Sequence, residues 1–508
     1  MEMQKNQEFE VLIEDYGNDG EGVCRIDDLV VFVKDAAKGD RAIVAITKVK
    51  KSHAYARLVR IIEPSPDRVE PPCLVSRVCG GCSLMHISYE KQLEWKQEKV
   101  KQCLKRIGGI EDPESIMEPI VGLKDPEDTQ TSPGQGLRYR NKAQLPVGIN
   151  KDGSTAIGFY GRHSHNVIDT DRCLLQAEGF DAVIKACRSF IDEYKVSVYD
   201  EETGKGLLRH IVLREGRKTG QIQVCLVING KKLRGSAKGG KKPENEQTGS
   251  IEQAFVNAIS QLPGVKSIVL NVNTERTNRI MGDEVRLLWG DMNIEDKIGG
   301  VRFSIGALSF YQVNPRQTGR MYEKAAEYAG LTGNETVWDL YCGIGTISLF
   351  MARSAEKVYG VEIVPQAIED AKRNAELNGF DNVSFFVGKA EEVLPREYEK
   401  NGIHADVIVV DPPRKGCDIK AIETMIRMQP DRIVYVSCDP ATLARDIKLL
   451  SEGGYQPVRA CAFDNFCHSA HIEVCCLLEQ LKRAKEFVQI GIDAEDYYSI
   501  KDLEKEED

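Results

Sequence analysis

A thiol and a carboxylate near the end of this chain could together carry out covalent catalysis. Cys438 lies in the run from Ile433 to Thr442, and Glu473 follows 35 residues later. A cysteine thiolate is a nucleophile, and a glutamate can serve as a base. The polar neighbours Ser437 and Asp439 favour a reactive thiol over one more buried cysteine. Taken alone, Glu473 fits a solvated strand residue, so the pairing is a hypothesis that the surrounding elements must support.

A glycine-containing loop predicts a cofactor site upstream of this pair. Gly343 and Gly345 lie in the run Asp339–Thr346, which follows an apolar strand and opens a helix. Glycines let the backbone approach a ligand, and a helix N-terminus favours polar or anionic groups. Glu362 ends the next strand, where a carboxylate can accept both ribose hydroxyls. The loop lacks the full dinucleotide fingerprint, so it suits a single nucleoside such as S-adenosylmethionine; the alternative is a tight turn without a ligand.

Apolar segments that alternate with helical segments predict the fold that would position these residues. The five strand candidates are 336–340, 357–361, 383–387, 407–410 and 432–436. Such alternation is typical of a doubly wound parallel sheet, a Rossmann-like α/β fold. Ligands bind at the carboxyl ends of the strands in these sheets. Asp411 and Cys438 both follow strands closely, so we expect both to face one crevice.

The N-terminal region predicts a separate small β-barrel. Short apolar runs separated by glycine turns occupy residues 9–62. Six Lys or Arg residues and no acidic residue occur in 41–62, and Tyr55 offers a ring for stacking. This surface is either an ordinary solvated face or a nucleic-acid-binding face.

Four cysteines between the barrel and the predicted sheet have the composition of a metal site. Cys73, Cys79 and Cys82 form a close triplet in a glycine-containing loop, and Cys173 lies further along the chain. Cys103 is the alternative fourth ligand. Four thiolates suit either zinc or a 4Fe-4S cluster, and the spacing alone does not choose between them. Unligated thiols in a loop would be prone to oxidation.

Length and composition are those of a multidomain soluble protein. The 508 residues are 42% hydrophobic and 29% charged, and this length predicts two or three domains. No apolar run approaches the ~20 residues that span a bilayer, and no signal peptide precedes the first strand, so a cytoplasmic protein without a membrane partner is expected. Fifteen cysteines in a reducing compartment favour ligands, nucleophiles or buried thiols over disulfides. The net charge of −10 argues only weakly against binding of nucleic acid. Half of it lies in residues 495–508, which hold seven acids and two lysines.

These patterns together predict a multidomain α/β protein in four parts. The parts are a β-barrel at 1–63, a central α+β domain with the cysteine cluster at 64–290, a Rossmann-like domain at 291–480 and an acidic tail at 481–508. Within the central domain, a helix is expected from about Tyr89 to Arg106.

Two motifs resemble those of the RNA uracil-5 methyltransferases. One is Asp411-Pro412-Pro413-Arg414-Lys415-Gly416 followed by Tyr435-Val436-Ser437-Cys438, and the other is Phe463-Asp464-Asn465-Phe466 leading to His471-Ile472-Glu473. Both motifs are specific, and the resemblance covers most of the chain. It implies that Cys438 is the nucleophile and Glu473 the base. It also implies that the residues contacting S-adenosylmethionine are Gln312, in the segment Phe310–Asn314, together with Tyr341, Glu362 and Asp411.

The mechanism implied by this resemblance is chemically consistent. C5 of uracil is a poor nucleophile, and addition of the Cys438 thiolate to C6 would activate it. S-adenosylmethionine would supply the methyl group, Glu473 would remove the C5 proton, and elimination would free Cys438. The uridine must be unpaired or flipped out of a helix, where Phe310 or Phe466 could stack on it.

Two positions depart from the family pattern. Asp439 stands where the family usually has asparagine after the nucleophile, and Cys467 stands where proline usually follows the signature phenylalanine. A second carboxylate near the thiol is expected to raise its pKa. Neither departure removes a catalytic group.

Within the family, the cysteine arrangement resembles that of the 23S rRNA-directed branch. This resemblance implies a 4Fe-4S cluster, rather than zinc, on Cys73, Cys79, Cys82 and Cys173. The N-terminal barrel resembles a TRAM domain, an OB-like RNA-binding module, and the segment Arg138–Lys142 resembles a basic motif that would shape the RNA-facing cleft. The leading prediction is therefore methylation of uridine C5 in 23S rRNA. The alternatives are the same reaction on the tRNA T-loop and an iron–sulfur RNA-binding protein whose methyltransferase domain is silent.

Overall fold

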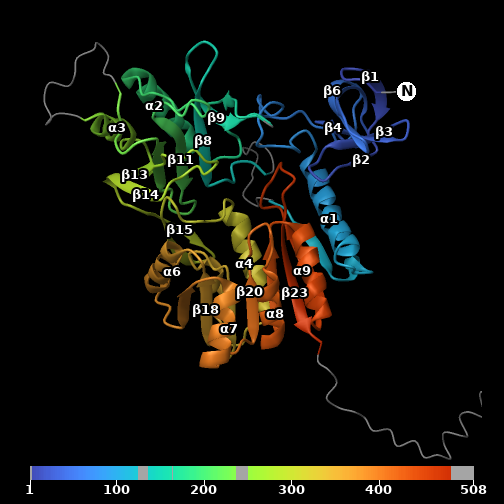
Figure 1. Ribbon diagram of the computed structural model, residues 1–508, viewed down its shortest axis with the longest axis vertical. Helices are drawn as coiled ribbons and strands as arrows, with labels where there is room; N and C mark the ends of the chain where they lie inside the picture. The colour runs from blue at the N-terminus through green and yellow to red at the C-terminus, as the bar shows by residue number, and fades with distance from the viewer. Residues whose placement is uncertain (1–2, 124–135, 163, 236–249, 482–508) are drawn as a thin grey trace, which may run out of the picture.

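The computed structural model describes residues 3–123, 136–162, 164–235 and 250–481, which fold into an N-terminal β domain, a central α+β domain and a C-terminal α/β domain (Figure 1). The acidic tail expected at 481–508 lies outside the described residues except for Leu481. All fifteen cysteines are free thiols. In the described part of the chain, no helix is both long and apolar enough to cross a membrane.

The N-terminal domain is a curled six-stranded sheet with the strand order β1-β5-β6-β4-β3-β2. Its strands are β1 (Glu8–Leu12), β2 (Asp15–Tyr16), β3 (Gly22–Ile26), β4 (Leu29–Lys34), β5 (Arg41–Val49) and β6 (His53–Glu63). Alternate residues such as Val31, Val33, Val44 and Ile46 are buried and form its core. The small β domain predicted from the glycine turns is thus confirmed.

The central domain is built on a seven-stranded sheet with the order β10-β9-β8-β11-β12-β13-β14. Its strands are β8 (Lys142–Ile149), β9 (Thr155–Tyr160), β10 (Val167–Asp169), β11 (Leu208–Glu215), β12 (Ile222–Ile228), β13 (Val265–Val272) and β14 (Glu284–Gly290). Helices α2 (Gly179–Tyr194) and α3 (Ile251–Ile259) pack on it through Phe180, Ile184 and Phe255. The hairpin of β15 (Ile294–Ile298) and β16 (Val301–Ile305) leads to the third domain.

The C-terminal domain is a mixed eight-stranded sheet with the order β19-β18-β17-β20-β21-β23-β22-β7. Its strands are β17 (Thr336–Leu340), β18 (Lys357–Glu362), β19 (Val383–Val387), β20 (Val407–Val410), β21 (Arg432–Ser437), β22 (Tyr455–Phe463), β23 (Glu473–Gln480) and β7 (Met117–Val121). Strands β17 to β21 are parallel, as the apolar runs predict, whereas β23 is antiparallel to β21 and β22.

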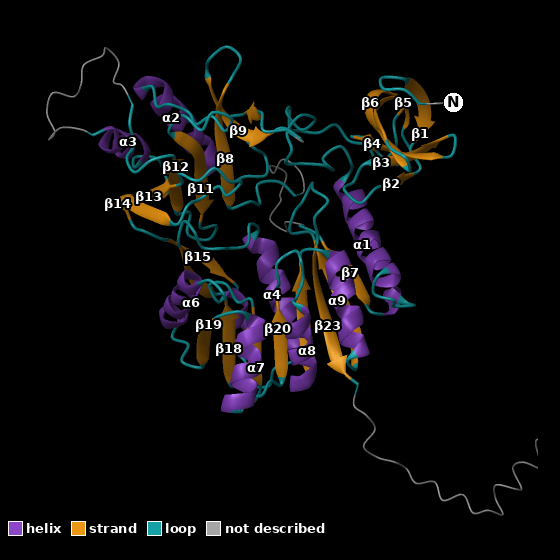
Figure 2. Ribbon diagram, viewed as in Figure 1, coloured by secondary structure: helices purple, strands orange, loops and turns teal. Residues whose placement is uncertain are grey.

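Helices cover both faces of this sheet (Figure 2). One face packs against α4 (Pro315–Ala329), α5 (Thr346–Met351) and α6 (Pro365–Asn378), and the other against α1 (Tyr89–Arg106), α7 (Ala390–Asn401), α8 (Ile419–Met428) and α9 (Pro440–Glu452). Proline at the first helical position and an N-cap that accepts a backbone hydrogen bond start both α4 and α9.

The segment that follows the cysteine cluster joins the C-terminal sheet, although it lies within the range 64–290 given to the central domain; the sequence left its place open. β7 pairs in parallel with β22, and α1 packs against α9; the short 3-10 helix η1 (Pro113–Ser115) connects α1 to β7. The catalytic domain is therefore discontinuous in sequence. A single strand without a repeated pattern gives no sign of which sheet it will join, so the boundary could not be placed from the sequence.

Candidate active site

Four of the predicted site residues, Tyr341, Glu362, Asp411 and Cys438, lie at the carboxyl ends of parallel strands. The strand order reverses between β17 and β20, because β18 and β19 continue on one side and β21 on the other. Such a reversal opens a crevice between the loops that follow the two strands. Tyr341 follows β17, and Asp411 follows β20. In Figure 2 this edge faces the central domain, and the antiparallel β23 points away from it.

Cys438 and Glu473 lie at facing ends of two neighbouring strands. Ser437, the last residue of β21, pairs with Val474 of the antiparallel β23. Cys438 is the next residue on one strand and Glu473 the next on the other, and paired strands lie only about 4.8 Å apart. Sheet pairing therefore brings together a thiol and a carboxylate that are 35 residues apart in the chain.

Burial makes both groups reluctant to ionise. It raises the pKa of the Cys438 thiol to about 11, and the charges of Glu473 and Asp411 act in the same direction, whereas Arg414 opposes them. Burial likewise raises the pKa of Glu473 far above its usual range, with Asp411 adding to the effect and Arg414 opposing it. Oε2 of Glu473 is buried without a hydrogen-bond partner. Burial and the charges of Asp411 and Arg414 therefore set the ionisation of the thiol and the carboxyl group together.

The loop after β17 is shaped as a cradle for a small ligand. Tyr341, Gly343 and Gly345 all have positive φ, at 67°, 55° and 81°. A Cβ atom on Gly343 would meet no atom within 4 Å, so the space beside this glycine is open. The carboxylate of Glu362 accepts hydrogen bonds from the backbone N–H groups of Gly343 (3.2 Å) and Val364 (2.9 Å), which fixes it at the rim of this space.

Two further carboxyl groups lie below this cradle. Burial raises the pKa of Asp339 and of Asp411 to about 7. Oδ2 of Asp339 accepts a hydrogen bond from Ser348 at 2.5 Å, while Oδ1 is buried without a partner. Open space, a fixed carboxylate and an unpartnered buried oxygen fit a polar nucleoside ligand with a cationic centre. The fit supports S-adenosylmethionine, whose sulfonium is positively charged.

Gln312 lies in a segment that the central domain anchors. Its side chain is buried, and its carbonyl accepts a hydrogen bond from Nδ2 of Asn141 at 3.0 Å. The backbone N–H of Asn141 donates to the carbonyl of Val313 at 2.9 Å, and Arg214 donates to the carbonyl of Ser309 at 2.7 Å. The motif Arg138–Lys142 thus holds the Gln312 segment, a function that its basic composition did not indicate.

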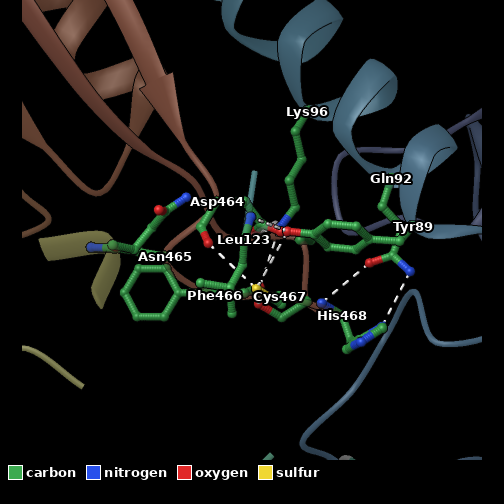
Figure 3. Close-up of polar contacts among 12 residues, drawn as sticks. Tyr89, Gln92, Lys96, Leu123, Asp464, Asn465, Phe466, Cys467 and His468 are labelled. Carbon is green, nitrogen blue, oxygen red and sulfur yellow. Dashed lines mark hydrogen bonds and ion pairs between the residues drawn. The ribbon is translucent and has the colours of Figure 1, made fainter. Parts of the chain in front are cut away.

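The two departures from the family pattern have structural explanations. Oδ1 of Asp439 accepts the N–H groups of Ala441 and Thr442, so its carboxylate caps α9. The charges that raise the pKa of Cys438 are instead Glu473 and Asp411, which corrects the expectation for Asp439. Cys467 is buried, and its thiol lies 3.4 Å from the carbonyl of Asp464 and 3.6 Å from the hydroxyl of Tyr89 (Figure 3).

The four predicted cysteine ligands lie in one part of the structure, where Cys73, Cys82 and Cys173 pack against the same small cluster of buried side chains. Burial raises the pKa of Cys82, and the nearby thiols of Cys173, Cys79 and Cys73 add to this effect. Cys103 lies in α1, where its pKa responds to Lys99 and Asp439, so it is separate from this group. Within the described residues, no three His, Cys, Asp or Glu side chains are placed to hold a single metal ion.

A basic and aromatic surface lies on the N-terminal domain. The ring of Tyr55 packs near those of Phe32 and His53, with centroids 5.8 and 5.2 Å away, and Nζ of Lys50 lies 5.7 Å from its centroid. The neighbouring exposed cations are Lys48, Lys51, Arg57 and Arg60. Aromatic rings framed by cations suit single-stranded nucleic acid.

Comparison with known proteins agrees with this geometry. The family model for tRNA (Uracil-5-)-methyltransferase matches residues 270–481, and that for the TRAM domain matches residues 2–59. An uncharacterized RNA methyltransferase of Halalkalibacterium halodurans is 49% identical over 478 residues, covering 94% of this chain and 98% of that protein. Another, from Clostridium acetobutylicum, is 44% identical over 481 residues, covering 95% and 99%.

A solved structure matches nearly the whole chain. The crystal structure of Pyrococcus abyssi tRNA (uracil-54, C5)-methyltransferase with S-adenosyl-L-homocysteine has a TM-score of 0.70 and 29% identity, covering 92% of this chain and 99% of that one. The doubly wound sheet, its cofactor crevice and the TRAM domain define an S-adenosylmethionine-dependent methyltransferase that acts on RNA. The chain belongs to the RNA (uracil-5-)-methyltransferase family.

Proposed function

We propose that this protein methylates C5 of a uridine in 23S rRNA through a covalent bond between Cys438 and C6 of the base. The observation that carries the proposal is the placement of Cys438 and Glu473 at facing ends of β21 and β23, beside the crevice of β17 and β20. A nucleophile and a base must reach adjacent ring carbons from one side of the sheet, and neighbouring strand ends provide that spacing.

Each group has a definite task in this reaction. The Cys438 thiolate forms a bond to C6 of the uracil, and the ring electrons displaced toward C5 make that carbon nucleophilic. When bound, S-adenosylmethionine supplies an electrophilic methyl group for C5. Glu473 then takes the C5 proton, the C5–H electron pair forms the C5–C6 double bond, and the C6–S bond breaks to release the Cys438 thiolate. Glu473 must be ionised for this step, and Arg414 is the group that favours its ionised form.

The surroundings supply the remaining contacts of the proposal. Glu362 would accept the ribose hydroxyls, the Gly343 backbone would lie against the nucleoside, and Gln312, Tyr341 and Asp411 would complete the cofactor site. Phe310, beside Gln312, is 69% exposed despite its large apolar ring. A flipped base needs an aromatic surface to stack on, and Phe310 is the exposed ring next to the cofactor segment.

Different observations support two candidate RNA substrates. The TRAM domain and the convergence of Cys73, Cys79, Cys82 and Cys173 support 23S rRNA, because the sequence resembles the rRNA-directed branch in both features. The second candidate is the T-loop of tRNA. It is supported by the Pyrococcus abyssi protein, which is a tRNA (uracil-54, C5)-methyltransferase and matches 92% of this chain.

Mass-spectrometric mapping of 5-methyluridine tests the activity and the substrate together. Purified protein is incubated with S-adenosylmethionine and with 23S rRNA or tRNA transcripts, in parallel with the Cys438→Ala variant. We expect 5-methyluridine at a defined position of 23S rRNA, and none with Cys438→Ala although that variant still binds RNA. Methylation of tRNA alone would establish the second candidate. Binding without methylation of either RNA would favour a silent RNA-binding protein.

We further propose that Cys73, Cys79, Cys82 and Cys173 hold a 4Fe-4S cluster. The thiols of Cys73, Cys79 and Cys173 all lie near enough to Cys82 to raise its pKa, and a four-iron cluster is held by four such thiolates. Anaerobic reconstitution with ferrous iron and sulfide should load about four irons per chain, with a broad visible absorbance. Cys173→Ser should lower iron content, whereas the matched Cys103→Ser should not. Stoichiometric zinc in place of iron would overturn the proposal.

A further inference from the structure

The loop that leads to Glu473 is held by side chains from a distant segment of the chain. This loop, residues 464–472, is called the base loop below; it connects the end of β22 to the first residue of β23. Residues 83–99, which follow the cysteine cluster and include most of α1, contact this loop. Figure 3 shows the contacts that Tyr89, Gln92 and Lys96 make with it. The contact joins residues more than 360 positions apart, since Lys96 and Asp464 are separated by 368.

Lys96 is the central member of this contact. Its side chain is fully buried, and Nζ lies 2.5 Å from Oδ1 of Asp464, whose side chain is also fully buried. The same ammonium group donates to the carbonyl oxygen of Phe466 at 3.1 Å. Burying two charges is unfavourable compared with packing apolar side chains of the same volume. A buried ion pair is therefore better explained by the fixed position that it gives the base loop than by a gain in stability.

Further contacts from residues 83–99 hold the rest of the base loop. The N–H groups of Ser83 and Leu84 both donate to the carbonyl of His468, at 2.9 and 3.0 Å. The N–H of His468 donates to Oε1 of Gln92 at 3.2 Å. Nζ of Lys99 donates to the carbonyl of Ala470 at 3.1 Å. His468 has a positive φ of 62°, a conformation unusual outside glycine that these contacts maintain.

Glu473 depends on this support because its own carboxylate has little else to fix it. Its Oε2 atom has no hydrogen-bond partner. The last residue pair between β21 and β23 is Ser437 with Val474, so Glu473 lies just beyond the ladder on the side of Cys438. On the other side it pairs with Phe463, the residue that enters the base loop. The direction in which the Glu473 side chain points is therefore set by its backbone, which follows directly on the base loop.

We propose that Lys96 is a positioning residue for proton removal by Glu473, acting through the base loop. The inference rests on the proposed covalent mechanism and adds a residue outside the sequence motifs to it. Lys96 touches neither substrate nor cofactor in this assignment. Its role is to hold Asp464 and the Phe466 carbonyl so that Glu473 meets the C5 proton.

The covalent mechanism provides a readout that separates positioning from mere folding. Formation of the C6–S bond requires Cys438, whereas breaking it requires Glu473 to take the C5 proton so that the C5–C6 double bond can form. A misplaced Glu473 therefore leaves protein and methylated RNA joined through the C6–S bond. This adduct survives denaturing gel electrophoresis, so its accumulation reports a defect in the base step alone.

The test compares Lys96→Met with Lys105→Met, an exposed lysine in the last turn of the same helix. The RNA is the one that wild-type protein methylates, and Glu473→Gln marks complete loss of the base. Lys96→Met should resolve the adduct about 10- to 100-fold more slowly than wild type, as expected for a misplaced catalytic group, while forming it at a similar rate. Lys105→Met, which loses the same charge, should behave as wild type.

A double variant keeps the inference testable if the single one fails to fold. Lys96→Met combined with Asp464→Asn removes both charges, so no ionised group remains buried alone. The folded double variant should also accumulate adduct. Resolution at the wild-type rate in either folded variant would overturn the inference, as would equal loss of adduct formation and resolution. Absence of both methylation and adduct with wild-type protein would instead refute the proposed function.

Discussion

The thiol of Cys438 needs activation before it can attack a uracil ring. Burial raises its pKa to about 11, and the charges of Glu473 and Asp411 disfavour the thiolate further. Arg414 is the cation that opposes these effects at Cys438, and it also opposes the raised pKa of Glu473. The reactivity of the site therefore depends on the balance between one guanidinium group and two carboxyl groups.

Replacement of Arg414 should change the pH dependence of the reaction. Arg414→Gln removes a positive charge that favours the thiolate, so the pKa of Cys438 rises and less thiolate is present at any pH below it. We expect the rising limb of the pH–rate profile to move up by about one unit and the rate at neutral pH to fall about tenfold. Rates of adduct formation at saturating RNA measure this. Arg414→Lys retains the charge and should keep the wild-type profile, and an unmoved limb in Arg414→Gln would contradict the assignment.

At the scale of single elements, α9 begins directly after Cys438, the proposed nucleophile. Asp439 is its N-cap, Pro440 is its first residue, and the cap carboxylate accepts two backbone N–H groups. The cap therefore fixes the end of β21 and the start of α9 around Cys438. Asparagine serves as an N-cap about as well as aspartate does, so the departure from the family pattern retains this structural role.

Substitutions of Asp439 should separate its capping role from any effect on the thiol. Asp439→Ala removes the cap and should lower the free energy of unfolding by about 1 kcal/mol. Asp439→Asn keeps the cap, so its unfolding transition and its methylation rate should stay close to those of wild type. Chemical denaturation and single-turnover assays of both variants measure these effects. A clearly faster reaction in Asp439→Asn would show that the carboxylate suppresses the thiolate after all.

At the scale of the whole molecule, the cysteine segment joins the three domains. Arg162, after β9, donates to the carbonyl of Cys79 at 3.2 Å and pairs with Asp35 of the N-terminal domain at 2.9 Å. Arg68 pairs with the buried Asp40 of the same domain at 2.5 Å. Residues just after Cys82 hold the base loop of the catalytic domain. Iron binding at these cysteines would therefore order the junction between the RNA-binding domain and the active site.

Local patterns predicted the elements well, because each is specified by its own residues. The helix at Tyr89–Arg106 and the strands at 336–340 and 407–410 have the predicted bounds. Motif resemblance supplied the candidate pair Cys438 and Glu473, and the structure places them at neighbouring strand ends. The assignment of their catalytic roles remains a prediction.

The contacts that position the site could not be predicted in the same way. Asn141 reaches the Gln312 carbonyl, and Lys96 reaches Asp464, across long stretches of chain. A lysine in the middle of an amphipathic helix reads as a solvated residue unless the tertiary partner is known. Likewise, only the folded structure shows that Cys173 lies near the other three cysteines and that Cys103 does not.

The pairing of β7 with β22 has a consequence for how the protein is made. Ala460 of β22 is aligned with Met117 of β7, so the outermost strand of the sheet is synthesised before its partner by most of the length of the chain. On the ribosome, β7 and the buried Lys96 of α1 emerge long before anything can cover them. The N-terminal and central domains can fold as they emerge, but the catalytic sheet closes only after β22 and β23 have emerged. Pairing between strands so far apart in sequence slows folding. Until β22 pairs with β7, unpaired strand edges of the catalytic sheet stay exposed, so chaperones would matter most during this step.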